Sequence, residues 1–280
     1  MVITPARIIE KLRYKLPDRL KLKQKLISMI NEKSSPLASS GFTENLAYVD
    51  LAMDNVMSAH EHYKTSVNYI LTNSKAVMDL APGMVRSPSL GWPWTLYFGL
   101  YGHSVDKTIE HYRLIISETE KEEGPQLDEI NIGSYLAYIS LTIIIYLIND
   151  RDHLKMYLTR IFNQTEKYSN ITLDEITSKP KDTEKFVGYY TRARGYIIKG
   201  LVDEDPNLVK HGLEITSNIH KKFVKYSDVP ESIVDRPLII LYDQAKSKWP
   251  DFYFETPFIP KSILEKGYWN QLMGEKKDGE

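Results

Sequence analysis

The stretch Ile132–Ile148, with the sequence IGSYLAYISLTIIIYLI, decides which kind of fold the chain can adopt. It carries no charge over 17 residues, whereas a helix that spans a membrane needs about 20 consecutive apolar residues. It also contains a glycine, two serines, a threonine and three tyrosines, which suit a protein core better than lipid. We therefore expect the buried central helix of a helical protein rather than a membrane span.

Helical signals continue on both sides of this stretch. Thr43, Asp182 or Thr183, and Asp205 precede apolar-periodic segments, where their side chains are suited to cap a helix. Further helices are expected at 44–71, 94–101, 152–164, 184–202, 207–226 and 230–248. Another helix is expected to start after a cap at Ser104 or Asp106 and to run to about residue 122. Only Phe252–Glu255 favours a strand, and one short strand cannot form a sheet.

The sequence thus predicts one all-α domain over residues 1–280, a multi-helix bundle of antiparallel helical hairpins. Its expected parts are basic N-terminal helices at 1–33, a helical core at 43–250, an extended C-terminal arm at 251–264 and a flexible tail at 270–280. In the C-terminal half, the segments 184–202 and 207–226 contain several glycines, which predicts a close approach of two helix backbones. This arrangement is typical of tetratricopeptide-type helix pairs, although their consensus is absent, and an ordinary antiparallel pair explains it equally well.

Composition excludes several classes of function. The 280 residues include no cysteine, so disulfides, thiolate catalysis and Cys-ligated zinc are excluded. The net charge of −1 gives no global attraction to nucleic acid or membrane. Because the N-terminus is too charged for a signal peptide and cysteine is absent, we expect a cytoplasmic protein.

The chain shows no motif that predicts catalysis or metal binding. His60 and His62 are two residues apart, so they lie on different sides of a helix and do not share a metal. Asp150 and His153 have a suitable spacing, but the second motif of a bundle metal site is missing. Nucleophile elbows, phosphate-binding loops and dinucleotide fingerprints are also absent. We therefore expect a protein without enzymatic activity, cofactor or metal.

Charge is distributed unevenly, and this suggests sites for a protein partner. Residues 1–33 hold nine Lys/Arg and three Asp/Glu, with almost no interleaved aromatic residues, which favours a solvated helix face over a nucleic-acid site. Residues 106–129 hold eight acidic and three basic residues. The acidic candidates for partner binding are Glu118, Glu120, Glu122, Glu123, Asp128 and Glu129. The alternative is that they form a frayed, solvated helix end.

A second candidate for partner binding is the pair Arg192 and Arg194, which flanks Ala193 beside Tyr189 and Tyr190. Two arginines next to tyrosines are suited to bind an anion or a carboxylate-rich partner. The alternative is that each arginine pairs with a local acidic residue. An enzyme with a scattered site around Tyr189, Arg192 and Arg194 also stays open.

The last third of the chain carries a resemblance to a known family. It runs from YTRARGY (190–196) through an acidic turn, a helix with His220 and the apolar PLIILYDQA (237–245) to the segment YFETPFIPKSIL (253–264). This order resembles the C-terminal part of immunity protein family 49, helical proteins of polymorphic toxin systems. Those proteins end similarly in a segment of the form acidic–x–Pro–Phe/Tyr–x–Pro–x–x–Leu, and the similarity covers about residues 184–264.

The resemblance implies a cytoplasmic protein that binds and blocks a cognate toxin. A toxin that acts on nucleic acid is usually basic at its substrate groove, so an acidic patch on the inhibitor would be complementary to it. The alternative is a helical-repeat adaptor that binds a peptide or protein partner. The arm itself is expected to be structural, with Phe258, Ile259, Ile263 and Leu264 docked on the preceding helices.

Overall fold

The computed structural model describes residues 36–72, 92–123, 132–172, 183–226 and 234–274, together with the single positions 24 and 175. The regular structure within these residues is entirely helical, which confirms the all-α prediction. The N-terminal helices predicted at 1–33 lie outside the described residues except for Gln24. The elements are α3 (Pro36–Ala52), α4 (Val56–Thr72), α7 (Trp92–Leu96), the π-helix η1 (Tyr97–Tyr101), α8 (Val105–Glu123), α9 (Ile132–Leu147), α10 (Arg151–Gln164), the 3-10 helix η3 (Glu166–Tyr168), α11 (Thr183–Asp203), α12 (Pro206–Tyr226), α13 (Arg236–Lys248), α14 (Lys261–Lys266) and α15 (Tyr268–Gly274).

The uncharged stretch forms α9, and its described side chains are almost all buried. Ile143, Ile144 and Ile145 are inaccessible to solvent, as expected for a helix that is surrounded by others. α9 packs against α10, α11 and α8. Among the residues that the structure describes, no helix is both long enough and apolar enough to cross a membrane.

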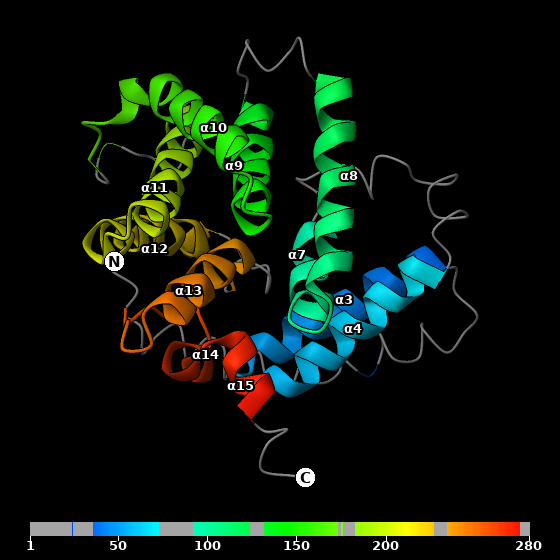
Figure 1. Ribbon diagram of the computed structural model, residues 1–280. Helices are drawn as coiled ribbons and strands as arrows, with labels where there is room; N and C mark the ends of the chain where they lie inside the picture. Colours follow the sequence, from blue (N-terminus) through cyan, green and yellow to red (C-terminus); the bar gives the residue numbers. More distant parts are fainter. Residues whose placement is uncertain are drawn as a thin grey trace.

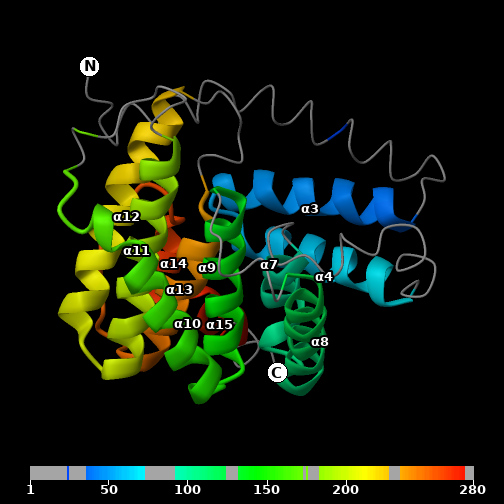
Figure 2. The same ribbon diagram turned by 90° about the horizontal axis from the view of Figure 1, so that it is seen from above.

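The helices form two groups, and the C-terminal segment lies beside both (Figure 1). The groups also contact each other directly, where α8 packs against α9. α9–α12 lie on one side and α3, α4, α7 and α8 on the other, and the view from above separates the groups in the same way (Figure 2). α13 contacts α9, α11 and α12 of the first group and α7 of the second. The C-terminal third therefore joins the two groups through α13.

The predicted helical hairpin of α11 and α12 is present, and glycine allows its close packing. A Cβ atom on Gly212 would lie 2.6 Å from the carbonyl oxygen of Ala193, closer than real Cβ contacts. A Cβ atom on Gly200 would lie 2.8 Å from the carbonyl oxygen of Asp205. Only glycine fits where the two backbones touch, which accounts for glycines inside long helices. Whether the pair belongs to a repeat stays a prediction.

Three helix boundaries differ from the sequence prediction. The helix expected at 44–71 is a hairpin of α3 and α4, because Asp54 adopts a left-handed conformation with φ of 59° and ends α3. α3 begins at Pro36, eight residues before the predicted helix start at 44. α13 begins at Arg236 rather than 230, because the Asp235 carboxylate caps it by accepting from the Leu238 N–H at 3.0 Å.

The C-terminal arm is partly extended and partly helical. Residues 252–260 lie outside helices, as predicted, but residues 261–264 belong to α14. The four apolar side chains expected to dock are all buried in the core. The flexible tail predicted from residue 270 is wrong for residues 270–274, which belong to α15, while 275–280 lie outside the described residues. α15 is ordered because Trp269 and Leu272 pack into the core.

Candidate functional site

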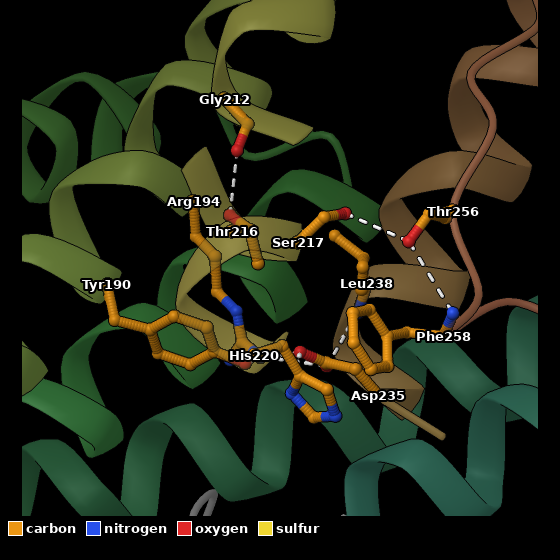
Figure 3. A network of polar contacts seen from close by, with 10 residues as sticks. All are labelled: Tyr190, Arg194, Gly212, Thr216, Ser217, His220, Asp235, Leu238, Thr256 and Phe258. Carbon is orange, nitrogen blue, oxygen red and sulfur yellow. Dashed lines mark hydrogen bonds and ion pairs between the residues drawn. The ribbon is translucent and has the colours of Figure 1, made fainter. Parts of the chain in front are cut away.

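Arg194 is at the centre of a buried polar network between α11, α12 and the start of α13 (Figure 3). One of its terminal nitrogens (Nη2) donates to both Asp235 carboxylate oxygens at 2.8 Å, and Tyr190 also donates its hydroxyl to Asp235. The guanidinium lies 4.0 Å from the centre of the Tyr190 ring. Burial alone would raise the pKa of Asp235, but Arg194 and the nearby His220 outweigh burial and hold that pKa below its usual value. Asp235 is therefore an ionised carboxylate in the protein interior.

The C-terminal arm is docked beside this network. Phe258 lies edge-on to the His220 ring, with 4.4 Å between the ring centres, and His220 lies 3.6 Å from Asp235. Ser217 on α12 donates to the Thr256 hydroxyl at 3.0 Å (Figure 3). Residues from three of the segments quoted in the sequence analysis, among them Arg194, His220 and Phe258, thus lie close together in the structure.

Arg192 turns to different neighbours. It donates to the Phe162 carbonyl at 3.0 Å and to the Tyr196 hydroxyl at 2.9 Å, and it forms a 3.1 Å ion pair with Glu166. Both arginines are largely buried, and each pairs with an acidic residue of this chain. In the structure each arginine pairs with an acidic residue of this chain, as the alternative interpretation expected.

The acidic candidates divide into two sets. Glu118, Glu120, Glu122 and Glu123 lie in the last turns of α8, whereas Asp128 and Glu129 lie outside the described residues. α8 packs on η1 and α9, and Figure 1 shows its acidic end at the far end from α3 and α4. The helix buries Thr108, Tyr112, Ile115 and Ile116. The structure therefore places these four acidic positions in the turns of α8 that follow these buried residues.

The exposed side of α8 contains an apolar residue in line with the acidic positions. Leu114 is 43% exposed, and Glu110 one turn before it is also exposed. Residues four apart in a helix share a face, so positions 110, 114, 118 and 122 form one row. The row consists of Glu110, Leu114, Glu118 and Glu122, an apolar position between acidic ones. We call this row the α8 row.

Sequence reasoning missed a pair of histidines. His60 on α4 and His103, which follows η1, face each other with their Nε2 atoms 2.9 Å apart. In the sequence analysis, His60 was compared only with the neighbouring His62. Because 43 positions separate the pair, no local spacing could reveal it.

A second buried carboxylate, Asp243 on α13, joins the helix groups. It accepts from the Tyr97 hydroxyl and from the Tyr268 backbone N–H, both at 2.6 Å. Burial raises the pKa of Asp243 to about 6, and the hydrogen bonds from Tyr97 and Tyr268 limit the increase. This group should make stability depend on pH.

We expect Asp243→Asn to be more stable relative to the wild type as pH rises. The pKa is about 6 in the folded protein against an ordinary 3.8, so the folded state binds the proton more tightly. Binding of this proton to Asp243 adds to the unfolding free energy, and the addition is complete below pH 3.8 and lost as pH rises through about 6. Between pH 5 and pH 7, the unfolding free energy of the wild type should fall by about 1 kcal/mol relative to the variant. Urea unfolding at both pH values measures this difference, and a constant difference would contradict it.

Comparisons with known proteins do not assign this chain to a family. No protein-family model matches the chain, and neither the curated proteins nor the solved structures gave a match. The resemblance to immunity protein family 49 therefore stays a prediction.

Proposed function

We propose that this chain is an immunity-type protein that binds and blocks a cognate toxin domain and performs no chemistry of its own. The observation that carries the proposal is the α8 row, in which exposed Leu114 follows exposed Glu110 and precedes the acidic positions 118 and 122. An apolar anchor with charged surroundings is a common design of protein interfaces.

The acidic residues at the end of α8 suggest that the partner's binding surface is basic. The positions 118, 120, 122 and 123 are all glutamate, so the sequence of the last turns of α8 contains closely spaced acidic residues. Enzymes that act on nucleic acid hold their substrate in a basic groove, where an acidic helix can replace phosphates. The expected partner is therefore a basic toxin domain, and inhibition would be steric and electrostatic.

The proposed partner-binding surface does not include Arg192 and Arg194. Arg192 and Arg194 are engaged with Glu166 and Asp235, so replacing them would change the fold before it changed a partner surface. The acidic positions of α8 are then the part of the original candidate set that supports partner binding.

Neutralising this surface should weaken the complex with the cognate toxin domain that the proposed function requires. We expect the combined change of Glu118, Glu120, Glu122 and Glu123 to alanine to lower affinity at least about tenfold, and to reduce its dependence on salt. Leu114→Ser should weaken binding through loss of the anchor. Calorimetric titration at low and high salt measures both effects.

A matched control separates local complementarity from net charge. In this control, four exposed acidic residues elsewhere are each replaced by alanine: Glu175, Glu214, Asp251 and Glu255. This control should bind as the wild type does. Equal affinities for both quadruple variants would contradict the α8 surface, and a toxin domain that binds neither of them nor the wild type would contradict the immunity function.

One feature favours the adaptor alternative. α9, α10, α11 and α12 pack successively against one another, as helix pairs do in repeat proteins that bind peptides. However, α13 of the same chain packs on α9, α11 and α12. A pull-down that recovers a regulatory protein instead of a toxin would support the adaptor.

A further inference from the structure

We propose that His60 and His103 form a binding site for one divalent transition-metal ion, such as Zn²⁺, Ni²⁺ or Cu²⁺. The site is independent of the α8 row and of toxin binding. His60 is buried on α4, whereas His103 is exposed, so the pair connects the interior with solvent. Imidazole is a good ligand for these three ions.

The hydrogen bonds of His60 fix which of its nitrogens faces the pair. Nδ1 lies 2.8 Å from the Phe98 carbonyl oxygen. A carbonyl only accepts, so Nδ1 carries the proton and donates it. Nε2 is then the atom with the lone pair, and it is directed at Nε2 of His103. Metal-binding histidines commonly have this arrangement, in which the second nitrogen donates to a carbonyl and orients the ring.

Burial supports the same protonation state. It lowers the pKa of His60, although the hydrogen bond to Phe98 opposes this effect, and the neighbouring His103 lowers that pKa further. A neutral imidazole is the form that binds a metal ion.

The distance between the two nitrogens is close to what a metal needs. Two nitrogens bound to Zn²⁺ at about 2.0–2.1 Å in a tetrahedral site lie about 3.3 Å apart. The present separation is 2.9 Å, a hydrogen bond in which the Nε2–H of His103 donates to Nε2 of His60. To bind the ion, His103 must carry its proton on Nδ1 instead of Nε2, and its ring must turn so that both Nε2 lone pairs are directed at the metal. His103 is exposed to solvent, and its ring also packs against the buried Trp269, so this movement changes that contact.

The surroundings hold the buried half of the site in place. The Phe98 carbonyl belongs to η1, and π-helical turns are frequent at functional sites. The same carbonyl accepts from the Tyr268 hydroxyl at 2.8 Å. The Trp269 ring packs edge-on against both imidazoles, with ring centres 5.4 Å from His60 and 5.3 Å from His103.

The protein supplies two ligands, and water completes the coordination. Within the described part of the chain, no group of three or more His, Cys, Asp or Glu side chains is arranged to hold a metal. We therefore expect moderate affinity, with Cu²⁺ bound more tightly than Ni²⁺ or Zn²⁺ in accordance with the usual order of stability.

The test is titration of the chelator-treated full chain with ZnCl₂, NiCl₂ or CuCl₂. We expect about one ion per chain with a Kd in the micromolar range. His103→Ala should lower affinity at least about tenfold, since one of two ligands is lost. His211→Ala, which removes another exposed histidine, should leave affinity unchanged. Cu²⁺ should also quench the fluorescence of Trp269 in the wild type, and much less in His103→Ala.

Two results would overturn the site. One is the same affinity in His103→Ala as in the wild type, and the other is no binding by a wild-type protein with its normal melting temperature. Trp269→Phe checks the quenching independently, because it keeps both ligands. It should bind the ion with little change in affinity while the Cu²⁺-dependent quenching falls, and undiminished quenching would place the ion elsewhere.

Discussion

Replacing Asp235 by alanine should lower the free energy of unfolding by about 3–5 kcal/mol, because it leaves the Arg194 charge buried without its partner. Both side chains are nearly inaccessible to solvent, and they share two 2.8 Å contacts. The same change removes the cap of α13 and an acceptor for the Tyr190 hydroxyl. A lost cap alone costs about 1 kcal/mol. Urea unfolding measures the total effect.

The control for this prediction is an ion pair on the surface. Lys199 and Asp203 are four residues apart on α11, and each is nearly half exposed. Lys199→Ala should change the unfolding free energy by at most about 0.5 kcal/mol. Asp235→Asn keeps a capping oxygen and should be less harmful than Asp235→Ala. Equal effects of Asp235→Ala and Lys199→Ala would show that the buried network does not stabilise the fold.

Phe258→Ala should cost about 3–5 kcal/mol, the usual loss when a fully buried aromatic ring is removed from a core. Phe258 is 0% exposed and packs edge-on against His220, although it lies in a segment without regular structure. The truncation would leave a cavity between the arm and α12. Thermal unfolding measures the loss, and deletion of residues 252–264 should lower the melting temperature at least as much.

The same arm provides the comparison. Tyr253 lies five residues earlier and is 49% exposed. Tyr253→Ala should stay within about 0.5 kcal/mol of the wild type. If Phe258→Ala melted together with Tyr253→Ala at the wild-type temperature, the arm would not be part of the core.

Patterns within one element were predictable from the sequence. The lack of charge in Ile132–Ile148 identified a buried helix, and the glycines of α11 and α12 identified a close helix pair. In both cases the sequence pattern that allowed the prediction lies within about 20 residues. The predicted extended arm was correct for residues 252–260, which lie outside helices.

Boundaries that depend on single backbone conformations were not predictable in the same way. The α3–α4 turn needs Asp54 in a left-handed conformation, and aspartate is compatible with this conformation but does not require it. α13 starts late because Asp235 serves as both cap and ion-pair partner. The order of α15 depends on distant core residues that its short sequence does not indicate.

The candidate site was the hardest part to predict, because its contacts are long-range. Arg194 and Asp235 are 41 positions apart, and His60 and His103 are 43 positions apart. A sequence shows that an arginine is present, but only the packing of α11 on α13 shows that it is buried. The acidic end of α8 was visible as composition, whereas the exposure of Leu114 beside it was not.

The proposed function requires that this chain binds a toxin domain directly. Calorimetric titration of the purified full chain with a purified cognate toxin domain measures this binding. We predict a complex with one copy of each partner and a Kd of about 1 µM or tighter, weakened by salt. Absence of heat in the titration, with the two proteins eluting separately in size-exclusion chromatography, would contradict the account.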